Sequence, residues 1–530
     1  MSELLERIVA TVVVTVLVCI ASVKCLGALQ QSGYQNKSFL RWLKKDGNLT
    51  FNRLAVLSLC LALSTAIVSL CFSFAGVKVA LVCSAVPFFV LWVAYLYADG
   101  KYALKVPLRF TARVKRLFGV YFLILASVLF TIISVLKMLM IVNGSTLYAL
   151  IAYVPVAVTP LLLPWLLCVA NGITSVFENA HNRKFVKKAG EKLARNNAIK
   201  IGVVGSYGKT SVKNILAQLL LEKYQVVASP QSFNTPMGVA KTVFDEKTDG
   251  AQVLIFEMGA RKKGDISELG EMIKPDFALF TGVCHQHIQT FGCLEEVYAE
   301  KRRIFDYTKE TVVCSASLKS RANEEKNALF VDDAQIEDIV YGAKETKFTL
   351  CVQGEKISVS TKLLGRSAVE NILLCVTLAS KLGLTAKEIA NGIAKLQPVP
   401  HRLQLVEENG VYILDDGYNC NAVGAEIAVQ ALLRFDGGKC IVTPGIVECG
   451  ALEEEINRAL GETIARANLD RVILVGQTLV GAVKNGYIDA GGDESKLFIE
   501  KTLDDAKANL SSWVQTGDAV LFLNDLPDIY

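Results

Sequence analysis

Five long apolar stretches fill most of the first 170 positions, and they constrain this chain more than any other feature. A bilayer core is crossed by about 20 helical residues, and within it only helices and closed barrels satisfy every backbone polar group. A mean hydropathy of +0.38 with 20% charged residues agrees with extensive lipid contact. We therefore predict a helical transmembrane domain over residues 1–174, with about five spans at 8–29, 54–74, 77–98, 117–142 and 146–170.

The basic residues between these stretches predict an orientation. Lys and Arg cluster in residues 37–53, 99–116 and 183–195, whereas the connections near Gly76 and Asn143 are almost uncharged. Because basic loops stay on the cytoplasmic side, we expect a multi-pass protein of the inner (plasma) membrane, with its N-terminus outside and its later domains in the cytoplasm. The first stretch lacks the basic start and the cleavage site of a signal peptide.

Charge is divided unevenly along the chain. Residues 1–200 have a net charge of +16 and residues 201–530 one of −11. Because the basic residues alternate with apolar runs, we expect membrane lipids and no nucleic acid as partners. No acid lies in the middle of a span, which argues against an ion pathway. The 14 cysteines include no C-x-x-C pair, so we expect free thiols.

The pattern changes after a basic linker helix predicted over residues 175–198. A short apolar strand at 199–204 leads into a glycine-rich turn, and a helix with regularly spaced apolar residues follows. Strand, Gly-rich turn, Gly-Lys-Thr and helix in this order are the context of a phosphate-binding loop. The loop residues expected to contact a nucleotide are Gly205, Ser206, Gly208, Lys209, Thr210 and Ser211.

The residue types of this loop suit ATP with Mg²⁺. Gly205 and Gly208 let backbone N–H groups approach phosphate oxygens closely. Lys209 supplies a cation to the phosphates, and the Thr210 hydroxyl can hold Mg²⁺. The N-terminus of the next helix adds a favourable field for anions. A Gly-Lys-Thr sequence that arose by chance in some other α/β domain is the alternative.

Further motifs follow the loop in a characteristic order. The general phosphate-loop motif would need a glycine at position 203, which is a valine here. The small residue instead stands one position earlier, at Gly202. The later motifs cover residues 232–239, 253–260, 286–288, 299–305, 365–371, 401–403 and 415–421. Between about residues 199 and 450 this series resembles the Mur ligase family, and most of all its D-alanyl-D-alanine-adding (MurF-like) branch.

The resemblance implies roles for three side chains in addition to Lys209 and Thr210. Glu257 and His287 correspond to groups at the magnesium sites. Lys301 corresponds to a lysine that becomes carbamylated, which would convert a cation into a metal-binding group. His285 lies as near as His287 in sequence, and we expect it to be structural. A plain surface lysine is the alternative for Lys301.

The second half of the resemblance concerns the nucleotide's base, ribose and phosphates. It implies an adenine contact for Asn371, a phosphate contact for Arg402, and a contact near the ribose and phosphate for Asp416. The alternative is that Asp415 and Asp416 are a pair of acids in a simple turn. The position of both acids after an apolar strand favours a site, because loops at strand ends carry the chemistry of α/β folds.

Several departures from the family concern the substrate that accepts the new bond. The usual N-terminal domain for a UDP-sugar precursor is absent, and the apolar stretches take its place. Ser367-Ala368 replaces the usual His-Asn, and residues 419–422 read Asn-Cys-Asn-Ala instead of Asn-Ala-Asn-Pro. The late Lys-Gly-Ser is missing. The ATP-binding half looks intact, whereas the acceptor half departs from the pattern.

Together these patterns predict a P-loop parallel-sheet ATPase domain over 199–398, with a polar insertion near 315–362, and a smaller Rossmann-like α/β domain over 399–530, with an active site between them. In the second domain we expect strands near 411–414, 439–443, 471–475 and 518–523, and helices near 424–434, 453–467 and 503–514.

The resemblance implies a membrane-anchored, ATP- and Mg²⁺-dependent ligase that joins a cell-wall precursor, lipid-linked or not, to an amino acid or dipeptide through an acyl phosphate. A non-catalytic nucleotide-binding scaffold for cell-wall synthesis and an ATP-driven transporter are the alternatives. The sequence leaves the oligomeric state unknown.

Overall fold

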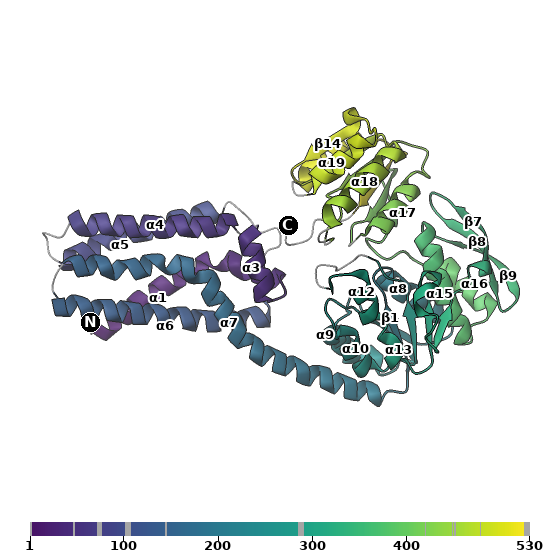
Figure 1. Ribbon diagram of the computed structural model, residues 1–530, viewed down its shortest axis with the longest axis horizontal. Helices are drawn as coiled ribbons and strands as arrows, with labels where there is room; N and C mark the ends of the chain where they lie inside the picture. Colours follow the sequence, from purple (N-terminus) through teal and green to yellow (C-terminus); the bar gives the residue numbers. More distant parts are fainter. Residues whose placement is uncertain are drawn as a thin grey trace. The chain divides into compact units, whose positions relative to one another are not determined.

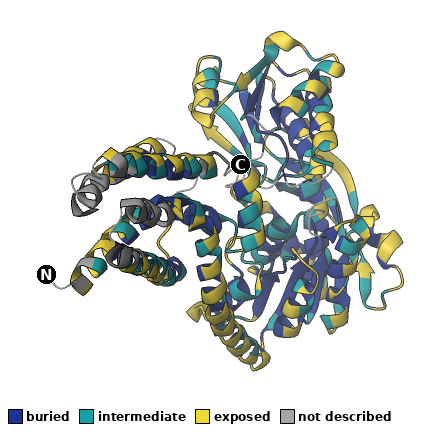
Figure 2. Cartoon of the chain, turned by 60° about the vertical axis from the view of Figure 1, so that its left-hand side comes forward, coloured by how far each residue is buried: buried dark blue, intermediate teal, exposed yellow. Residues whose placement is uncertain are grey.

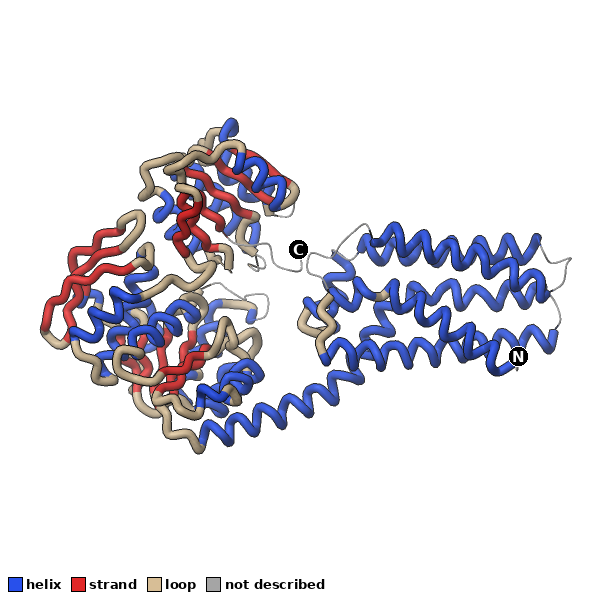
Figure 3. The backbone as a smooth tube through the Cα atoms, turned by 180° about the vertical axis from the view of Figure 1, so that it is seen from behind, coloured by secondary structure: helices blue, strands red, loops and turns tan. Residues whose placement is uncertain are grey.

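The computed structural model describes residues 3–45, 48–71, 77–100, 108–143, 146–284, 291–418, 420–447, 449, 452–476 and 479–523. The chain divides into two compact units, one that extends to Asn182 and a second that begins at Arg183 (Figure 1). The described strands all belong to the second unit (Figure 3).

The first unit is built from helices. They are α1 (Glu3–Ala21), α2 (Val23–Gln31), α3 (Asn36–Lys45), α4 (Asn48–Cys71), α5 (Val77–Gly100), α6 (Ala112–Asn143) and α7 (Thr146–Ala194). Their buried side chains form one apolar cluster that includes Leu29, Leu61, Trp92, Leu125 and Leu167. Many other apolar side chains of these helices are exposed, for example Val56, Leu59 and Leu123 at 60–65%.

The prediction of five spans is wrong in its count. Among the described residues, three helices are long and apolar enough to cross a membrane: Phe51–Val68, Ala112–Val135 and Ala157–Ala194. A fourth span results if Arg7–Ala21 and Val23–Gln31, which are bent by 47°, count as one. The bend falls at Ser22, whose hydroxyl contacts the Val18 carbonyl oxygen at 2.8 Å and the Tyr121 hydroxyl at 2.7 Å. The region predicted as 77–98 lies in α5, of which the part searched for spans among the described residues counts as a shorter apolar helix, Phe89–Ala98.

The linker predicted as a separate helix is the continuation of α7. This helix runs without interruption for 49 residues from Thr146 to Ala194, so the predicted fifth span and the basic linker are one element. Gly172 leaves the helix unbroken because a single glycine only weakens a helix. Beyond Arg183, the apolar side chains Ala189 and Leu193 join the core of the second unit.

A six-stranded parallel sheet forms the first half of the second unit, as predicted. Its order is β2-β3-β1-β4-β5-β6, with β1 at Ile199–Val204, β2 at Val226–Ala228, β3 at Val253–Glu257, β4 at Phe277–Phe280, β5 at Thr311–Cys314 and β6 at Ala328–Phe330. Nearly all residues of β1, β3 and β4 are buried (Figure 2). Because β1 lies between β3 and β4, the carboxyl ends of these three strands meet at one edge, where α/β sheets bind ligands.

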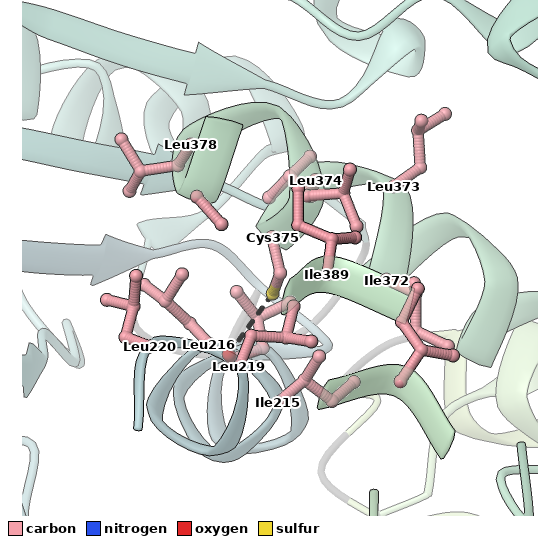
Figure 4. Packing of buried hydrophobic residues seen from close by; sticks show 14 of the residues in the cluster. Ile215, Leu216, Leu219, Leu220, Ile372, Leu373, Leu374, Cys375, Leu378 and Ile389 are labelled. Atoms are coloured by element: carbon pink, nitrogen blue, oxygen red, sulfur yellow. Dashed lines mark hydrogen bonds between the residues drawn. The ribbon is translucent and has the colours of Figure 1, made fainter. Parts of the chain in front are cut away.

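Helices cover the sheet and fix the loop that follows β1. They are α8 (Lys209–Leu220), α9 (Pro236–Val243), α10 (Asp265–Ile273), α12 (Leu294–Lys301), α13 (Ile304–Tyr307), α15 (Arg366–Lys381) and α16 (Ala386–Lys395). Figure 4 shows the apolar face of α8, with Leu216 and Leu219, against side chains of α15 and α16. The Cys375 thiol on α15 also contacts the Val212 carbonyl oxygen at 3.4 Å.

The predicted polar insertion contains a small antiparallel sheet. Its strands are β7 (Ile336–Tyr341), β8 (Thr346–Val352) and β9 (Glu355–Thr361), in that order. Phe348, Leu350 and Val359 join the same core as α8 and α15. The earlier part of the insertion also supplies β6 to the main sheet, so the segment is not wholly peripheral.

The last part of the chain forms a second six-stranded sheet in the order β10-β11-β15-β12-β13-β14. Its elements are β10 (Gln404–Glu408), β11 (Val411–Asp416), α17 (Ala422–Leu432), β12 (Lys439–Thr443), α18 (Glu453–Ala467), β13 (Arg471–Val475), α19 (Val480–Asp489), β14 (Leu497–Glu500), α20 (Leu503–Ser511) and β15 (Ala519–Leu523). The four predicted strands and three predicted helices are present. The sequence analysis missed β10, β14 and α19.

Candidate active site

The loop after β1 has the shape of a phosphate cradle because two glycines permit it. Gly205 has φ +152° and Gly208 has φ +72°, in the region where L side chains are strained. A Cβ at Gly205 would lie 1.9 Å from Oγ1 of Thr281, so the position admits glycine alone. The Ser206 N–H donates to the Gly282 carbonyl oxygen at 2.8 Å, which ties the loop to the end of β4.

Two groups in the cradle are suited to a phosphate. Among the described residues, the buried Ser206 hydroxyl has no hydrogen-bond partner. The Lys209 ammonium donates to the loop's own carbonyl oxygens, to Gly205 at 2.8 Å and to Ser206 at 3.2 Å, and burial lowers its pKa. Because buried polar atoms are normally paired, a free hydroxyl beside a lysine at a helix N-terminus fits an anion.

Glu257 ends β3 beside the loop and is 2% exposed. The Thr210 hydroxyl donates to its Oε2 at 2.9 Å, and the Asn234 amide donates to its Oε1 at 3.2 Å. A carboxylate and a hydroxyl are oxygen donors of the kind that Mg²⁺ prefers, so this pair fits the predicted metal. The described residues contain no cluster of three His, Cys, Asp or Glu side chains around it.

The predicted histidine cannot be placed in this site. His287, and His285 with it, lie in 285–290, outside the described residues. The role of His287 at a magnesium site therefore stays a prediction.

Lys301 ends α12 and is 2% exposed, which rules out the alternative of a surface lysine. Burial, and next the positive charge of Lys209, lower the pKa of Lys301 to about 7. The preceding Glu300 faces elsewhere, since its carboxylate accepts from Gly264 N–H at 2.9 Å and Ile266 N–H at 2.8 Å. Lys301 is thus a buried amine that loses its proton near neutral pH.

Asn371 of α15 lies against the loop, because a Cβ at Gly208 would come within 3.0 Å of its Oδ1. The positive charge of Arg402 reaches Lys209 and contributes, after burial, to lowering the pKa of that lysine. The structure therefore places Asn371 against the phosphate loop, and it places Arg402 where its charge acts on Lys209.

The segment that carries Arg402 is held by the end of β11. The Arg402 guanidinium donates to the Tyr418 carbonyl oxygen at 2.6 Å. Asp416 accepts from Leu403 N–H at 3.0 Å, and burial raises the pKa of its carboxyl group. Asp415 instead pairs with His401 at 2.7 Å. Both acids therefore hold the segment 401–403, Asp415 through the His401 side chain and Asp416 through the Leu403 backbone.

A cavity of about 750 Å³ opens beside the loop, and the sequence analysis did not anticipate it. Tyr207 of the loop lines it together with Ser317, Tyr341, Arg366 and Glu370, while α17 closes one side. Aromatic rings with a few polar groups are the usual lining of a small-molecule site. The cavity's position beside Tyr207 puts room for a nucleoside next to the phosphate cradle.

Three residues that border this site were also missed. Thr281 follows β4 and donates to the Tyr207 carbonyl oxygen. Asn234 belongs to a motif that was noted, but it was not assigned a role. Lys213 is 1% exposed on α8, and its ammonium is 3.5 Å from Glu257 Oε2. Lys213 stands three residues before Leu216 and seven before Leu220, at the spacing of the apolar face of α8, and this spacing was the signal that could have identified it.

The phosphate loop and the parallel sheet around it are similar to those of the Mur ligases. The Mur ligase middle-domain model matches residues 203–379. The UDP-N-acetylmuramoyl-tripeptide–D-alanyl-D-alanine ligase of Bacillus subtilis is 26% identical over 340 residues, 61% of this chain and 72% of that protein. The Escherichia coli ligase of the same name is 29% identical over 293 residues, which are 52% of this chain and 64% of that protein. This chain therefore spans less than two thirds of the length of the Escherichia coli ligase.

Solved structures agree with the sequence comparison. The MurF ligase of Thermotoga maritima in complex with ADP superposes with a TM-score of 0.59 at 27% identity, over 66% of this chain and 81% of that one. MurF from Acinetobacter baumannii, at 22% identity and a TM-score of 0.58 over 65% and 77%, shares the fold. Residues 203–379 are therefore a Mur ligase middle domain, and the chain is a homologue of the MurF ligases.

Proposed function

We propose that this chain is a membrane-anchored ligase that uses ATP to join a carboxylate to an amine through an acyl phosphate. The observation that carries the proposal is the phosphate cradle itself: an unpartnered buried Ser206 hydroxyl, the Lys209 ammonium, and the Thr210–Glu257 pair at one strand edge. The ADP complex of the Thermotoga maritima relative supports nucleotide binding by this fold.

In the proposed reaction, a substrate carboxylate oxygen attacks the γ-phosphorus, and the bond from that phosphorus to the β–γ bridging oxygen breaks to release ADP. An amine nitrogen then attacks the acyl carbon, phosphate leaves, and the nitrogen loses a proton. Lys209 and Arg402 would balance negative charge on the transferring oxygens. Thr210 and Glu257 would hold Mg²⁺, whose role is to neutralise the phosphate oxygens.

Lys301 suits the carbamylation that the resemblance implies. Only a neutral amine attacks CO₂, forming an N–C bond and losing one proton, and burial keeps the Lys301 pKa near 7. The carbamate of Lys301 would carry a negative charge near the positive charge of Lys209. It would therefore attract Lys209, whereas a protonated Lys301 is repelled by it. A carbamate would also add oxygen ligands of the type Mg²⁺ prefers.

We propose a peptidoglycan-type precursor as the carboxylate substrate and an amino acid or dipeptide as the amine. The names of the relatives support this, since they are ligases of UDP-N-acetylmuramoyl-tripeptide and D-alanyl-D-alanine. The apolar helices support attachment to the plasma membrane, and the basic residues of the segments between them support a cytoplasmic ligase. A site anchored there suits a lipid-linked precursor, because the membrane concentrates such a substrate near the enzyme.

A nucleotide-binding scaffold without catalysis is the second candidate. Two departures from the family favour it: Ser367-Ala368 in place of His-Asn, and the changed residues 419–422. Both lie outside the phosphate cradle, so they leave the nucleotide-binding residues intact while altering other positions of the family pattern.

One experiment separates the two functions. The full chain, purified in lipid nanodiscs, is given Mg²⁺-ATP with a panel of lipid-linked and nucleotide-linked precursors and amino acids. A ligase releases ADP and phosphate only when both a carboxylate and an amine are present, and a new amide appears by mass spectrometry. Nucleotide binding without turnover on any pair would identify a scaffold, and absence of nucleotide binding would contradict both functions.

A further inference from the structure

Lys213 is a buried lysine to which the proposed reaction gives no role. It lies on α8 one turn after Thr210, which places both side chains on neighbouring positions of the helix surface. Its side chain is 1% exposed. A buried ammonium is costly unless it is paired, so the groups that pair with it define what it does.

Two partners share the Lys213 ammonium. It is 3.5 Å from Glu257 Oε2, the oxygen that also accepts from the Thr210 hydroxyl at 2.9 Å. It also donates to the carbonyl oxygen of Gln231, in the loop between β2 and α9. Lys213 therefore connects the carboxylate at the phosphate cradle to the backbone of a separate loop.

That loop, residues 229–235, contacts Glu257 at two further points. Ser229 Oγ accepts from the Glu257 N–H at 3.2 Å, and Asn234 donates to Glu257 Oε1 at 3.2 Å. Gln231 has φ +46°, a left-handed conformation that non-glycine residues adopt only when their surroundings hold them there. The hydrogen bond from Lys213 to its carbonyl oxygen is one such constraint.

The 229–235 loop also contacts the C-terminal domain. Ser232 Oγ lies 3.1 Å from the Tyr418 hydroxyl, and the Tyr418 ring lies under the Arg402 guanidinium at 4.7 Å from its centroid. A continuous set of contacts thus runs from Glu257 through Lys213 and the loop to the residue beside Arg402.

We propose that Lys213 is a positioning residue that transmits occupation of the phosphate cradle by a Mg²⁺–nucleotide to the 229–235 loop. The inference rests on the proposed nucleotide binding and adds a route from that site to the C-terminal domain. A divalent cation held by Thr210 and Glu257 would share the Oε2 oxygen with Lys213. The lysine would then pair less with Glu257 and more with the Gln231 carbonyl oxygen, which tightens the loop.

Hydrogen–deuterium exchange on the full chain in nanodiscs tests this, with ADP and Mg²⁺ as the probe and ADP binding measured in parallel by calorimetry. In the unmodified chain, Mg²⁺-ADP should slow amide exchange in 229–235 by about threefold or more. In Lys213→Met, ADP should bind within about threefold of the normal Kd, but the loop should no longer respond. Lys213→Arg, which keeps the charge and donors, should restore the response.

Lys200→Met is the matched control. Lys200 is also buried and donates to carbonyl oxygens, those of Asn196 at 2.8 Å and Ala198 at 3.3 Å, but it lies at the start of β1, away from the cradle. Its loss should leave the loop response intact. If Lys213→Met does not fold, Lys213→Gln replaces it with the same expectation.

The outcomes separate this proposal from the proposed function. An unchanged loop response in a Lys213 variant that still binds ADP overturns the role of Lys213 and leaves the ligase proposal standing. The same conclusion follows if ADP binds the unmodified chain without any change in 229–235. Failure of the unmodified chain to bind ADP would instead contradict the proposed function.

Discussion

The Thr210 hydroxyl donates a hydrogen bond of 2.9 Å to Oε2 of Glu257 and so joins the phosphate cradle after β1 to the end of β3. The two residues are 47 positions apart in the chain, and the pairing of β1 with β3 brings them together. A hydroxyl and a carboxylate held in this way need little rearrangement to accept a cation.

Replacing Lys209 with alanine should remove the cation that faces the phosphates. We expect ATP to bind at least about tenfold more weakly, which corresponds to about 1.4 kcal/mol, and turnover to fall at least about a hundredfold because the transferred group loses its charge partner. Calorimetry and ADP release measure the two effects. Lys387→Ala, at an exposed position of α16, is the control and should change neither. Normal turnover in Lys209→Ala would refute the cradle's role.

Changing Glu257 to glutamine should weaken both Mg²⁺ use and the fold. Lys213 would lose its carboxylate partner, and breaking a buried pair from one side costs about 3 kcal/mol. We expect a lower thermal midpoint and a higher Mg²⁺ concentration for half-maximal activity. Glu268→Gln, at an exposed position of α10, should leave both unchanged. An unaltered Mg²⁺ requirement in Glu257→Gln would show that Glu257 is not a ligand.

Lys301 should make stability depend on pH. Its folded pKa of about 7 lies below the usual lysine pKa of 10.5, so between these pH values the unfolded chain binds more protons and stability rises with pH. From pH 7 to pH 9 the gain is about 2 kcal/mol. Thermal unfolding of the unmodified chain and of Lys301→Met, measured at both pH values, isolates this contribution. Parallel pH dependences in the two proteins would mean that Lys301 is not titrating in this range.

The exposed apolar side chains of α4 should face lipid. Leu59 and Leu63 are 60% and 54% exposed, and an arginine at the centre of a span costs about 2.5–3.5 kcal/mol on insertion. Leu59→Arg with Leu63→Arg should therefore reduce the fraction of chain that resists alkaline extraction from membranes. Leu503→Arg, at a 43% exposed position of α20, should have no effect. Equal extraction of both variants would argue against α4 as a span.

The sequence was sufficient where a local pattern specifies the structure. The strand 199–204 and the glycine-rich turn could be predicted because an apolar run, two glycines and a Gly-Lys-Thr each limit the backbone strongly, and β1 has the predicted bounds. In contrast, Lys213 and Thr281 become part of the site only through the packing of α8 and the β4 end against the loop. Such contacts join residues far apart in sequence.

Two errors had a different physical origin. The change from apolar to basic residues after position 170 does not end the helix, and so the 49-residue α7 was predicted as a span followed by a separate linker. The bend at Ser22 depends on a hydroxyl contact with Tyr121, 99 residues later in the chain. The number of spans could therefore not be settled by counting apolar stretches.

The contact between Gly205 and Thr281 has a kinetic consequence. Because Oγ1 of Thr281 occupies the space that a Cβ at Gly205 would need, the curve of the cradle is set by the chain itself. A nucleotide then meets a loop backbone that already has its curve, and its association should be limited mainly by diffusion and orientation. Substitutions around the cradle would accordingly alter how long the nucleotide stays rather than how fast it arrives.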